Sequence, residues 1–164
     1  MTIILGIDPG SRITGYGLIA QEGRGWRYLD SGCIRMNTEQ PLPERVKTIF
    51  RCLGELIVTW RPTQASVEQV FLSNNADSAL KLGQARGAVM ATLASASLKV
   101  HEYATRKVKQ SIVGTGAADK TQVAFMVRRL LPKAGDVSSD AADALAVAIC
   151  AAHHRPVAGQ RRLA

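Results

Sequence analysis

The hydrophobic pattern of the chain changes its period near Leu42, and this change limits the chain to a small set of folds. Before Leu42, short runs rich in apolar, β-branched and aromatic residues are separated by glycine-containing turns, a pattern typical of strands. We expect three strands joined as an antiparallel meander, over residues 3–8, 14–20 and 26–36. Pro9 and Gly10 end the first strand, and residues 21–25 form a hairpin connection.

After Leu42, apolar residues recur at intervals of three and four, the spacing that places them on one face of a helix. This predicts a helix from Leu42 that stops at Pro62. The later segments predict strands over residues 64–72 and 98–103 and helices over residues 75–97, 119–131 and 140–152. We assign no element to the basic segment 106–109. The order favours an α/β fold, with a mixed five-stranded sheet flanked by helices.

The length and charge of the chain limit the class of protein. Its 164 residues are enough for one domain whose core needs neither disulfides nor a structural metal. We expect a single domain over residues 1–154 and a flexible basic tail over residues 155–164. A hydrophobic content of 46% argues against disorder, and the net charge of +8 favours a polyanionic partner. That partner is a nucleic acid or, as the alternative, anionic lipid.

The sequence predicts a protein of a reducing compartment, the cytoplasm. The longest apolar run, residues 141–152, is too short for a membrane-spanning helix and contains Asp143. The first residues lack the basic leader and apolar stretch of a signal peptide. Cys33, Cys52 and Cys150 lie far apart, which suits neither a disulfide framework nor a thiolate metal site.

Four carboxylates are the candidate catalytic groups. Asp8 and Glu68 lie in or at the end of apolar strands, where an unpaired carboxylate is strongly penalised by lost hydration. Asp140 and Asp143 are three positions apart near the start of an alanine-rich helix, so they share one face. If the first and fourth strands are neighbours and the last helix packs beside them, these groups converge into an oxygen-rich site. Such a site suits Mg²⁺ or Mn²⁺ rather than zinc, and two ions about 4 Å apart would support hydrolysis of a phosphodiester.

Each carboxylate taken alone also has an ordinary interpretation. Asp8 precedes a Pro-Gly pair and can be a turn carboxylate, and Asp140 or Asp143 can simply favour the start of a helix. Glu68 is the hardest to explain in this way, because apolar residues flank it on both sides. The metal site therefore depends on the assumed fold.

Four sequence motifs stand in order along the chain: GIDPGSR at residues 6–12, VEQVF at 67–71, NADSALKLGQARG at 75–87 and DAADAL at 140–145. Together they closely resemble the RuvC family of Holliday-junction resolvases, and the third motif is the most specific. The resemblance implies an RNase H-like fold, a homodimer and a Mg²⁺-dependent endonuclease. Such an enzyme nicks two strands of like polarity symmetrically across a four-way DNA junction and leaves ligatable 5′-phosphate ends. The resemblance also implies RuvA and RuvB branch-migration proteins as partners in recombinational repair.

The resemblance assigns roles to individual residues. The four carboxylates match the metal-binding catalytic set of the family, and Lys109 and Lys120 match its catalytically important lysines. Phe71 matches an aromatic wedge, which could stack on an unpaired base at the junction centre. Arg12 and Arg86, inside the matching motifs, are further candidates for DNA contact. From the residues alone, Phe71 could equally be a core side chain and the lysines ordinary solvated ones.

The expected helix over residues 75–97 carries many small side chains: Ala79, Gly83, Ala85, Gly87, Ala88, Ala91 and Ala94. Small side chains let another element approach closely. That element is either a symmetry-related copy of the helix in a dimer or the sheet of the same chain, and the sequence does not choose.

Two other functions fit parts of the sequence. A DNA-junction binding module without catalysis would explain the basic charge, but not the carboxylates, because negative charge beside a phosphate path weakens binding. An ATPase of the actin-like or sugar-kinase fold also leads from its first strand into an acidic, glycine-containing turn. Such an ATPase needs a second lobe and further phosphate loops, for which 164 residues leave no room.

Overall fold

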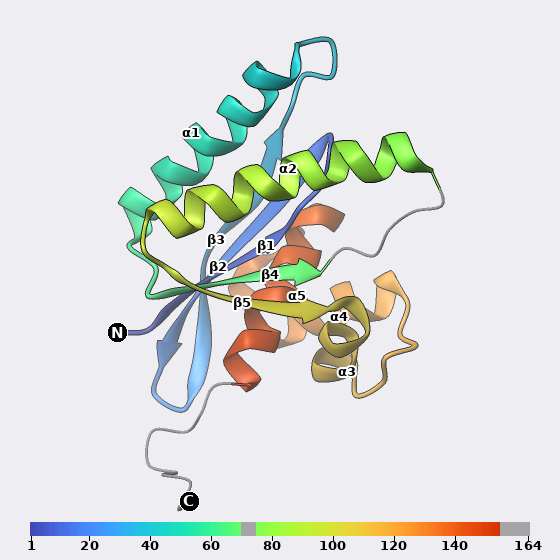
Figure 1. Ribbon diagram of the computed structural model, residues 1–164. Coiled ribbons are helices and arrows are strands. Elements are labelled where there is room, and N and C mark those ends of the chain that lie inside the picture. Colours follow the sequence, from blue (N-terminus) through green and yellow to red (C-terminus); the bar gives the residue numbers. More distant parts are fainter. Residues whose placement is uncertain (70–74, 155–164) are drawn as a thin grey trace, which may run out of the picture.

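A computed structural model describes residues 1–69 and 75–154, and within these ranges one mixed sheet has helices on both faces (Figure 1). Its strands are β1 (Ile3–Asp8), β2 (Ile13–Glu22), β3 (Gly25–Arg35), β4 (Gln64–Gln69) and β5 (Lys99–Ala104). They lie in the order β3-β2-β1-β4-β5. The first three strands are antiparallel neighbours, whereas β4 runs parallel to β1 and β5 runs parallel to β4. The expected meander followed by parallel strands is confirmed.

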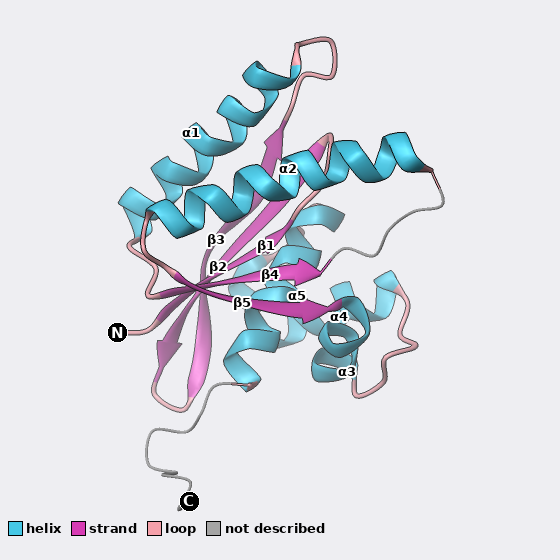
Figure 2. Cartoon of the chain, viewed as in Figure 1, coloured by secondary structure: helices cyan, strands magenta, loops and turns pink. Residues whose placement is uncertain are grey.

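The helices are distributed along the second part of the chain (Figure 2). They are α1 (Leu42–Trp60), α2 (Ala76–Ser95), α3 (Thr105–Val113), α4 (Lys120–Leu130) and α5 (Ser139–His153), with a short 3₁₀ turn at Pro132–Ala134. Four of them lie where the sequence predicts a helix. The prediction is wrong for the basic segment 106–109, to which no element was assigned, because this segment belongs to α3. None of the described helices is long and apolar enough to cross a membrane.

Helices α1 and α2 cover one face of the sheet (Figure 1). Alternate strand residues point to them, as the two-residue period of a strand requires. The resulting core contains Leu5, Ile7, Ala65 and Val67 from the sheet, Ile49 and Leu53 from α1, and Val89 and Leu93 from α2. Ala85 of α2 is buried in this core, whereas Gly83 and Gly87 are exposed. The small residues of α2 therefore serve partly for packing on the sheet of the same chain.

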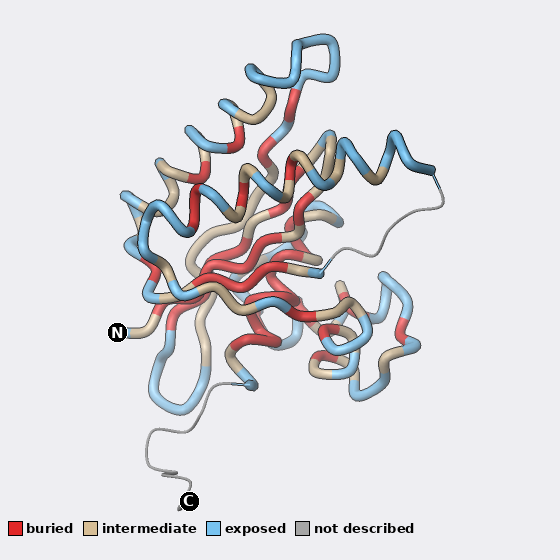
Figure 3. The backbone as a smooth tube through the Cα atoms, viewed as in Figure 1, coloured by how far each residue is buried: buried red, intermediate tan, exposed pale blue. Residues whose placement is uncertain are grey.

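Helices α3, α4 and α5 cover the other face, and α5 is the central element of that layer. Its residues from Ala141 to Ala151 are buried except for the half-buried Asp143, and Figure 3 shows this helix mostly in red. The second core combines α5 with Ile4 and Ile19 of the sheet, Val108 and Ile112 of α3, and Val123 and Val127 of α4.

Glycines in β1 and β2 set how closely α5 approaches the sheet. A Cβ added to Gly6 would overlap the carbonyl oxygen of Ala144, and one added to Gly15 would overlap the carbonyl oxygen of Asp140. At these positions only a residue without a side chain lets a helix backbone rest directly on the strand backbone. The first turns of α5 are thereby held against the ends of β1 and β2.

Candidate active site

Asp8 and Glu68 lie at the carboxyl ends of adjacent parallel strands and on the same face of the sheet. β1 and β4 are in register with Ile7 opposite Val67, so Asp8 and Glu68 are the next residue on each strand. Ile7 and Val67 are fully buried in the core beneath α1 and α2. Because side chains alternate along a strand, Asp8 and Glu68 point to the opposite face, on which α5 packs.

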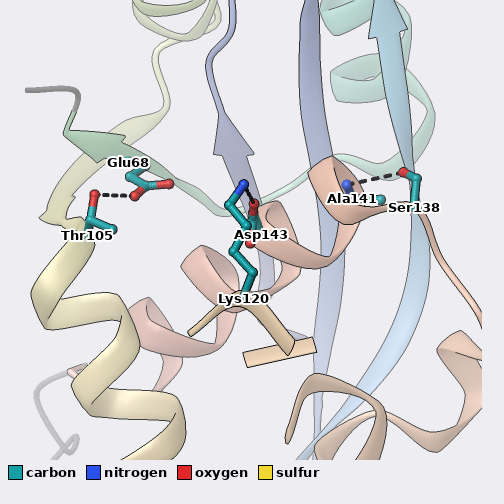
Figure 4. Close-up of polar contacts among 6 residues, drawn as sticks. All are labelled: Glu68, Thr105, Lys120, Ser138, Ala141 and Asp143. Atoms are coloured by element: carbon teal, nitrogen blue, oxygen red, sulfur yellow. Dashed lines mark hydrogen bonds and ion pairs between the residues drawn. The ribbon is translucent and has the colours of Figure 1, made fainter. Parts of the chain in front are cut away.

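Helix α5 brings the other two carboxylates to this edge of the sheet. The hydroxyl of Ser138 caps the helix by accepting a hydrogen bond from the N–H of Ala141 at 3.4 Å (Figure 4). Asp140 rests against Gly15, which is the strand partner of Asp8. Asp143 follows less than one turn later on α5. The four carboxylates are thus gathered from three elements that are distant in the sequence.

A pocket of about 400 Å³ opens at this place. Asp8, Glu68 and Asp143 line it, and Lys109 from α3 and Lys120 from α4 add two cationic side chains. The remaining lining residues are Pro9, Gln69, Thr105, Val108, Val123 and Ala146. A concave site that contains both carboxylates and lysines is suited to a ligand that carries both phosphate groups and metal ions.

The pKa of Asp8 reflects the burial and the charges of the pocket. Burial, as the largest cause, and the negative charges of Glu68, Asp143 and Asp140 together raise the pKa of Asp8 from 3.8 to about 8. Burial penalises the ionised carboxylate and the acidic neighbours repel its charge, so a bound cation would favour the ionised form.

Two further contacts hold the carboxylates in place (Figure 4). Lys120 Nζ lies 3.2 Å from Asp143 Oδ2, and the Asp143 carboxylate raises the pKa of Lys120. The hydroxyl of Thr105, the first residue of α3, donates a hydrogen bond to Glu68 Oε1. The sequence analysis did not identify Thr105, whose only local signal is its position directly after a strand.

The donor set fits a divalent metal ion in its chemistry. In residues 1–69 and 75–154, no three Asp, Glu, His or Cys side chains already form a metal-binding group. Asp143 is paired with Lys120, and Glu68 accepts a hydrogen bond from Thr105. All four carboxylates nevertheless offer only oxygen ligands, which Mg²⁺ and Mn²⁺ prefer. Asp8, Glu68 and Asp143 line one pocket, so their oxygen atoms can reach a common ligand.

Asp140, Arg12 and Arg86 are not among the residues that line this pocket. Arg12 is exposed just before β2, at the same end of the sheet as Asp8. Arg86 of α2 forms an ion pair with Glu102 of β5. Phe71 and the tail over residues 155–164 lie outside the described residues.

The sequence of the chain matches known proteins along most of its length. The family model described as crossover junction endodeoxyribonuclease RuvC matches residues 4–151. A protein of that name from Marinobacter nauticus is 60% identical over 153 residues, which cover 93% of this chain and 87% of the relative. Another from Ectopseudomonas mendocina is 55% identical over 155 residues, covering 94% and 88%.

A solved structure has the same fold. It is the T. thermophilus RuvC in complex with a Holliday junction substrate, and it superposes with a TM-score of 0.86 at 35% sequence identity. The match covers 93% of each chain. The similarity therefore extends over the sheet and both helical layers.

Proposed function

The chain belongs to the RuvC family of Holliday-junction resolvases, which are metal-dependent endonucleases with an RNase H-like fold, and from this premise we propose where and how it cuts. The active site is the pocket at the carboxyl ends of β1 and β4. The observation that carries this assignment is the meeting of Asp8, Glu68, Asp140 and Asp143 beside Lys109 and Lys120.

The four carboxylates would hold Mg²⁺, with Mn²⁺ as a substitute, and the set is large enough for two ions. When bound, these ions supply Lewis acidity for activating the attacking water and stabilising the leaving oxygen. As metal ligands, Asp8 and Asp143 would both be ionised, because a metal-bound carboxylate carries no proton.

Lys120 and Lys109 act on the DNA phosphate. Lys120 has 76% of its side chain exposed, so it can turn from Asp143 toward a phosphate at the pocket mouth. Lys109 is half-buried on α3 and also lines the pocket. Both lysines would position the scissile phosphate and stabilise the negative charge that develops during attack by water.

The substrate is a four-way DNA junction, and the chain acts on it as a homodimer. The exposed side of α2 carries Gly83, Gly87 and Ala91, together with Leu80, whose side chain is 62% exposed. Such a surface allows a second copy of the helix to approach closely. Two active sites related by a twofold axis would nick two strands of like polarity symmetrically and leave ligatable 5′-phosphate ends.

Further DNA contacts come from Phe71, Arg12 and Arg86. Phe71 follows Glu68 by three residues, and an aromatic ring there would stack on an unpaired base at the junction centre. Arg12 and Arg86 would contact phosphates. Phe71→Ala should impair cleavage of junctions more than binding to linear duplex, and unchanged junction cleavage would contradict the wedge.

We assign this activity to a single domain over residues 1–154 with a basic tail over residues 155–164, acting in the cytoplasm. RuvA and RuvB branch-migration proteins would be its partners in DNA recombination and repair. The other candidate, a junction-binding module without catalysis, leaves the gathering of Asp8 with three further carboxylates unexplained.

The test compares the wild-type protein on a synthetic four-way junction and on a linear duplex of the same sequence. We expect paired, symmetric nicks in the junction with Mg²⁺, no cleavage in EDTA, and products that a ligase seals. Equal cleavage of the duplex would indicate a general nuclease. Binding of the junction without nicks in either Mg²⁺ or Mn²⁺ would indicate a binding module.

A further inference from the structure

The hydroxyl of Thr105 contacts one of the four carboxylates without belonging to the acidic cluster. It donates a hydrogen bond to Glu68 Oε1, as Figure 4 shows. β4 and β5 are parallel neighbours with Glu68 opposite Tyr103, which brings the start of α3 close to Glu68. Thr105 lies just beyond the end of β5, and its hydroxyl reaches Glu68 from the first turn of α3.

The hydroxyl is not needed to cap the helix. Thr105 is the first residue of α3, and the N-cap position is held by Ala104, which makes no side-chain capping bond. The branched side chain of threonine has few rotamers, so its hydroxyl is held in a narrow range of directions. These two features direct the hydroxyl to the carboxylate rather than to the backbone of its own helix.

We propose that Thr105 is a positioning residue that orients Glu68 for metal binding, a role that rests on the proposed function of Glu68. Glu68 lines the pocket together with Asp8 and accepts a hydrogen bond from Thr105. A cation held by these carboxylates would leave the bond from Thr105 in place. Because Thr105 contacts Oε1, the other carboxylate oxygen of Glu68 would hold the ion.

The same contact ties α3 to β4. Lys109 lies four residues after Thr105, on the same face of α3, and both residues line the pocket. The hydrogen bond from Thr105 therefore fixes the start of the helix relative to Glu68 and, with it, the position of Lys109 across the pocket. Thr105 does not touch the DNA or the metal in this role and acts through its neighbours.

The test removes the donor while keeping the shape of the side chain. Thr105→Val should weaken binding of Mn²⁺ to the DNA-free protein by about tenfold or more, the scale expected for loss of a partner that orients a metal ligand. The Mg²⁺ concentration for half-maximal cleavage should rise by a similar factor. Thr105→Ser keeps the donor and should restore both values. Calorimetry measures the Mn²⁺ affinity, and junction affinity in EDTA should stay unchanged.

Further variants separate the possible outcomes. Thr105→Ala also lacks the donor but has a smaller side chain. If it gives the same metal affinity as Thr105→Val, misfit of the valine is excluded as the cause. It also replaces Thr105→Val in the test if that variant folds poorly. Thr59→Val, exposed on α1 at the other face of the sheet, is the matched control and should behave as wild type. Wild-type Mn²⁺ affinity and Mg²⁺ dependence in both donor-free variants would overturn the positioning role. If Glu68→Gln also leaves them unchanged, the metal assignment itself fails.

Discussion

Lys120 on α4 and Asp143 on α5 form an ion pair, with Nζ 3.2 Å from Oδ2. The two residues come from helices that pack side by side on the same face of the sheet, and both line the pocket that contains Asp8 and Glu68. Asp143 is largely buried, with 20% of its side chain exposed, whereas Lys120 reaches toward solvent. The pair holds a metal-binding candidate and a phosphate-binding candidate in contact before DNA arrives.

Asp143→Asn should abolish strand cleavage and leave junction binding nearly intact. Loss of a residue that only orients a metal ligand already costs up to about 100-fold, so loss of a direct carboxylate ligand should lower the cleavage rate by more than about 100-fold. Binding persists because the change removes negative charge near the phosphates. Gel assays of cleavage in Mg²⁺ and of binding in EDTA measure the two effects. Asp136→Asn, with 93% of its side chain exposed, is the control, and equal nicking by the Asp143 variant would refute the assignment.

The stability of the metal-free protein should fall as pH rises from about 4 to about 8. Burial and the neighbouring carboxylates raise the pKa of Asp8 from 3.8 to about 8 in the folded protein. Over this window the folded state keeps a proton that the unfolded chain releases, so a rise in pH favours unfolding. The slope from one such group is at most about 1.4 kcal/mol per pH unit. Urea denaturation in EDTA at several pH values should show a smaller decline for Asp8→Asn. Identical slopes would contradict the prediction.

Metal should reverse this trend. Since the carboxylates bind metal in their ionised form, stabilisation by Mg²⁺ should grow with pH over the same window. Thermal melts of the wild-type protein with and without Mg²⁺ measure the difference. A Mg²⁺-induced shift in melting temperature that is constant between pH 5 and pH 8, or larger at pH 5, would contradict the prediction.

Gly15→Ala should destabilise the fold and disturb the active site together. The added methyl group would overlap the carbonyl oxygen of Asp140 and push the first turn of α5 from the sheet. Forced insertions of this kind cost about 1–3 kcal/mol of unfolding free energy, and cleavage should fall because Asp140 and Asp143 move. Gly54→Ala in α1 is the control, because no described atom lies within 4 Å of the Cβ it would add. Chemical denaturation and cleavage assays compare the two variants. Equal stability and equal cleavage in Gly15→Ala and Gly54→Ala would contradict the prediction.

Asp119→Ala should loosen the start of α4 and reduce cleavage. The Asp119 carboxylate accepts a hydrogen bond from the N–H of Gln122 at 2.8 Å, and the Gln122 side chain accepts one from the N–H of Asp119 at 2.9 Å. Loss of this cap costs about 1 kcal/mol and releases the turn that begins with Lys120. Asp119→Asn keeps a capping side chain and should retain most of the activity. Full cleavage by Asp119→Ala would show that Lys120 does not depend on the cap.

The sequence predicts most elements correctly because their signals are local. The three-and-four spacing after Leu42 and the break at Pro62 define α1, which ends at Trp60. Helix α3 escaped prediction because it has nine residues, of which Val108 and Ile112 are buried. So short a helix depends on packing against its neighbours rather than on its own propensity.

The candidate carboxylates could also be chosen from the sequence, since an acidic residue such as Glu68 among apolar strand residues is a local anomaly. The position of these carboxylates next to one another could not be read from the local sequence. It depends on the register that places Ile7 opposite Val67 and on the glycines that admit α5 to the sheet. The contact between Thr105 and Glu68 spans 37 positions of the chain. Local free energies decide which segments become strands and helices, but distances between side chains on different elements are set by strand pairing and core packing, which exist only in the folded chain.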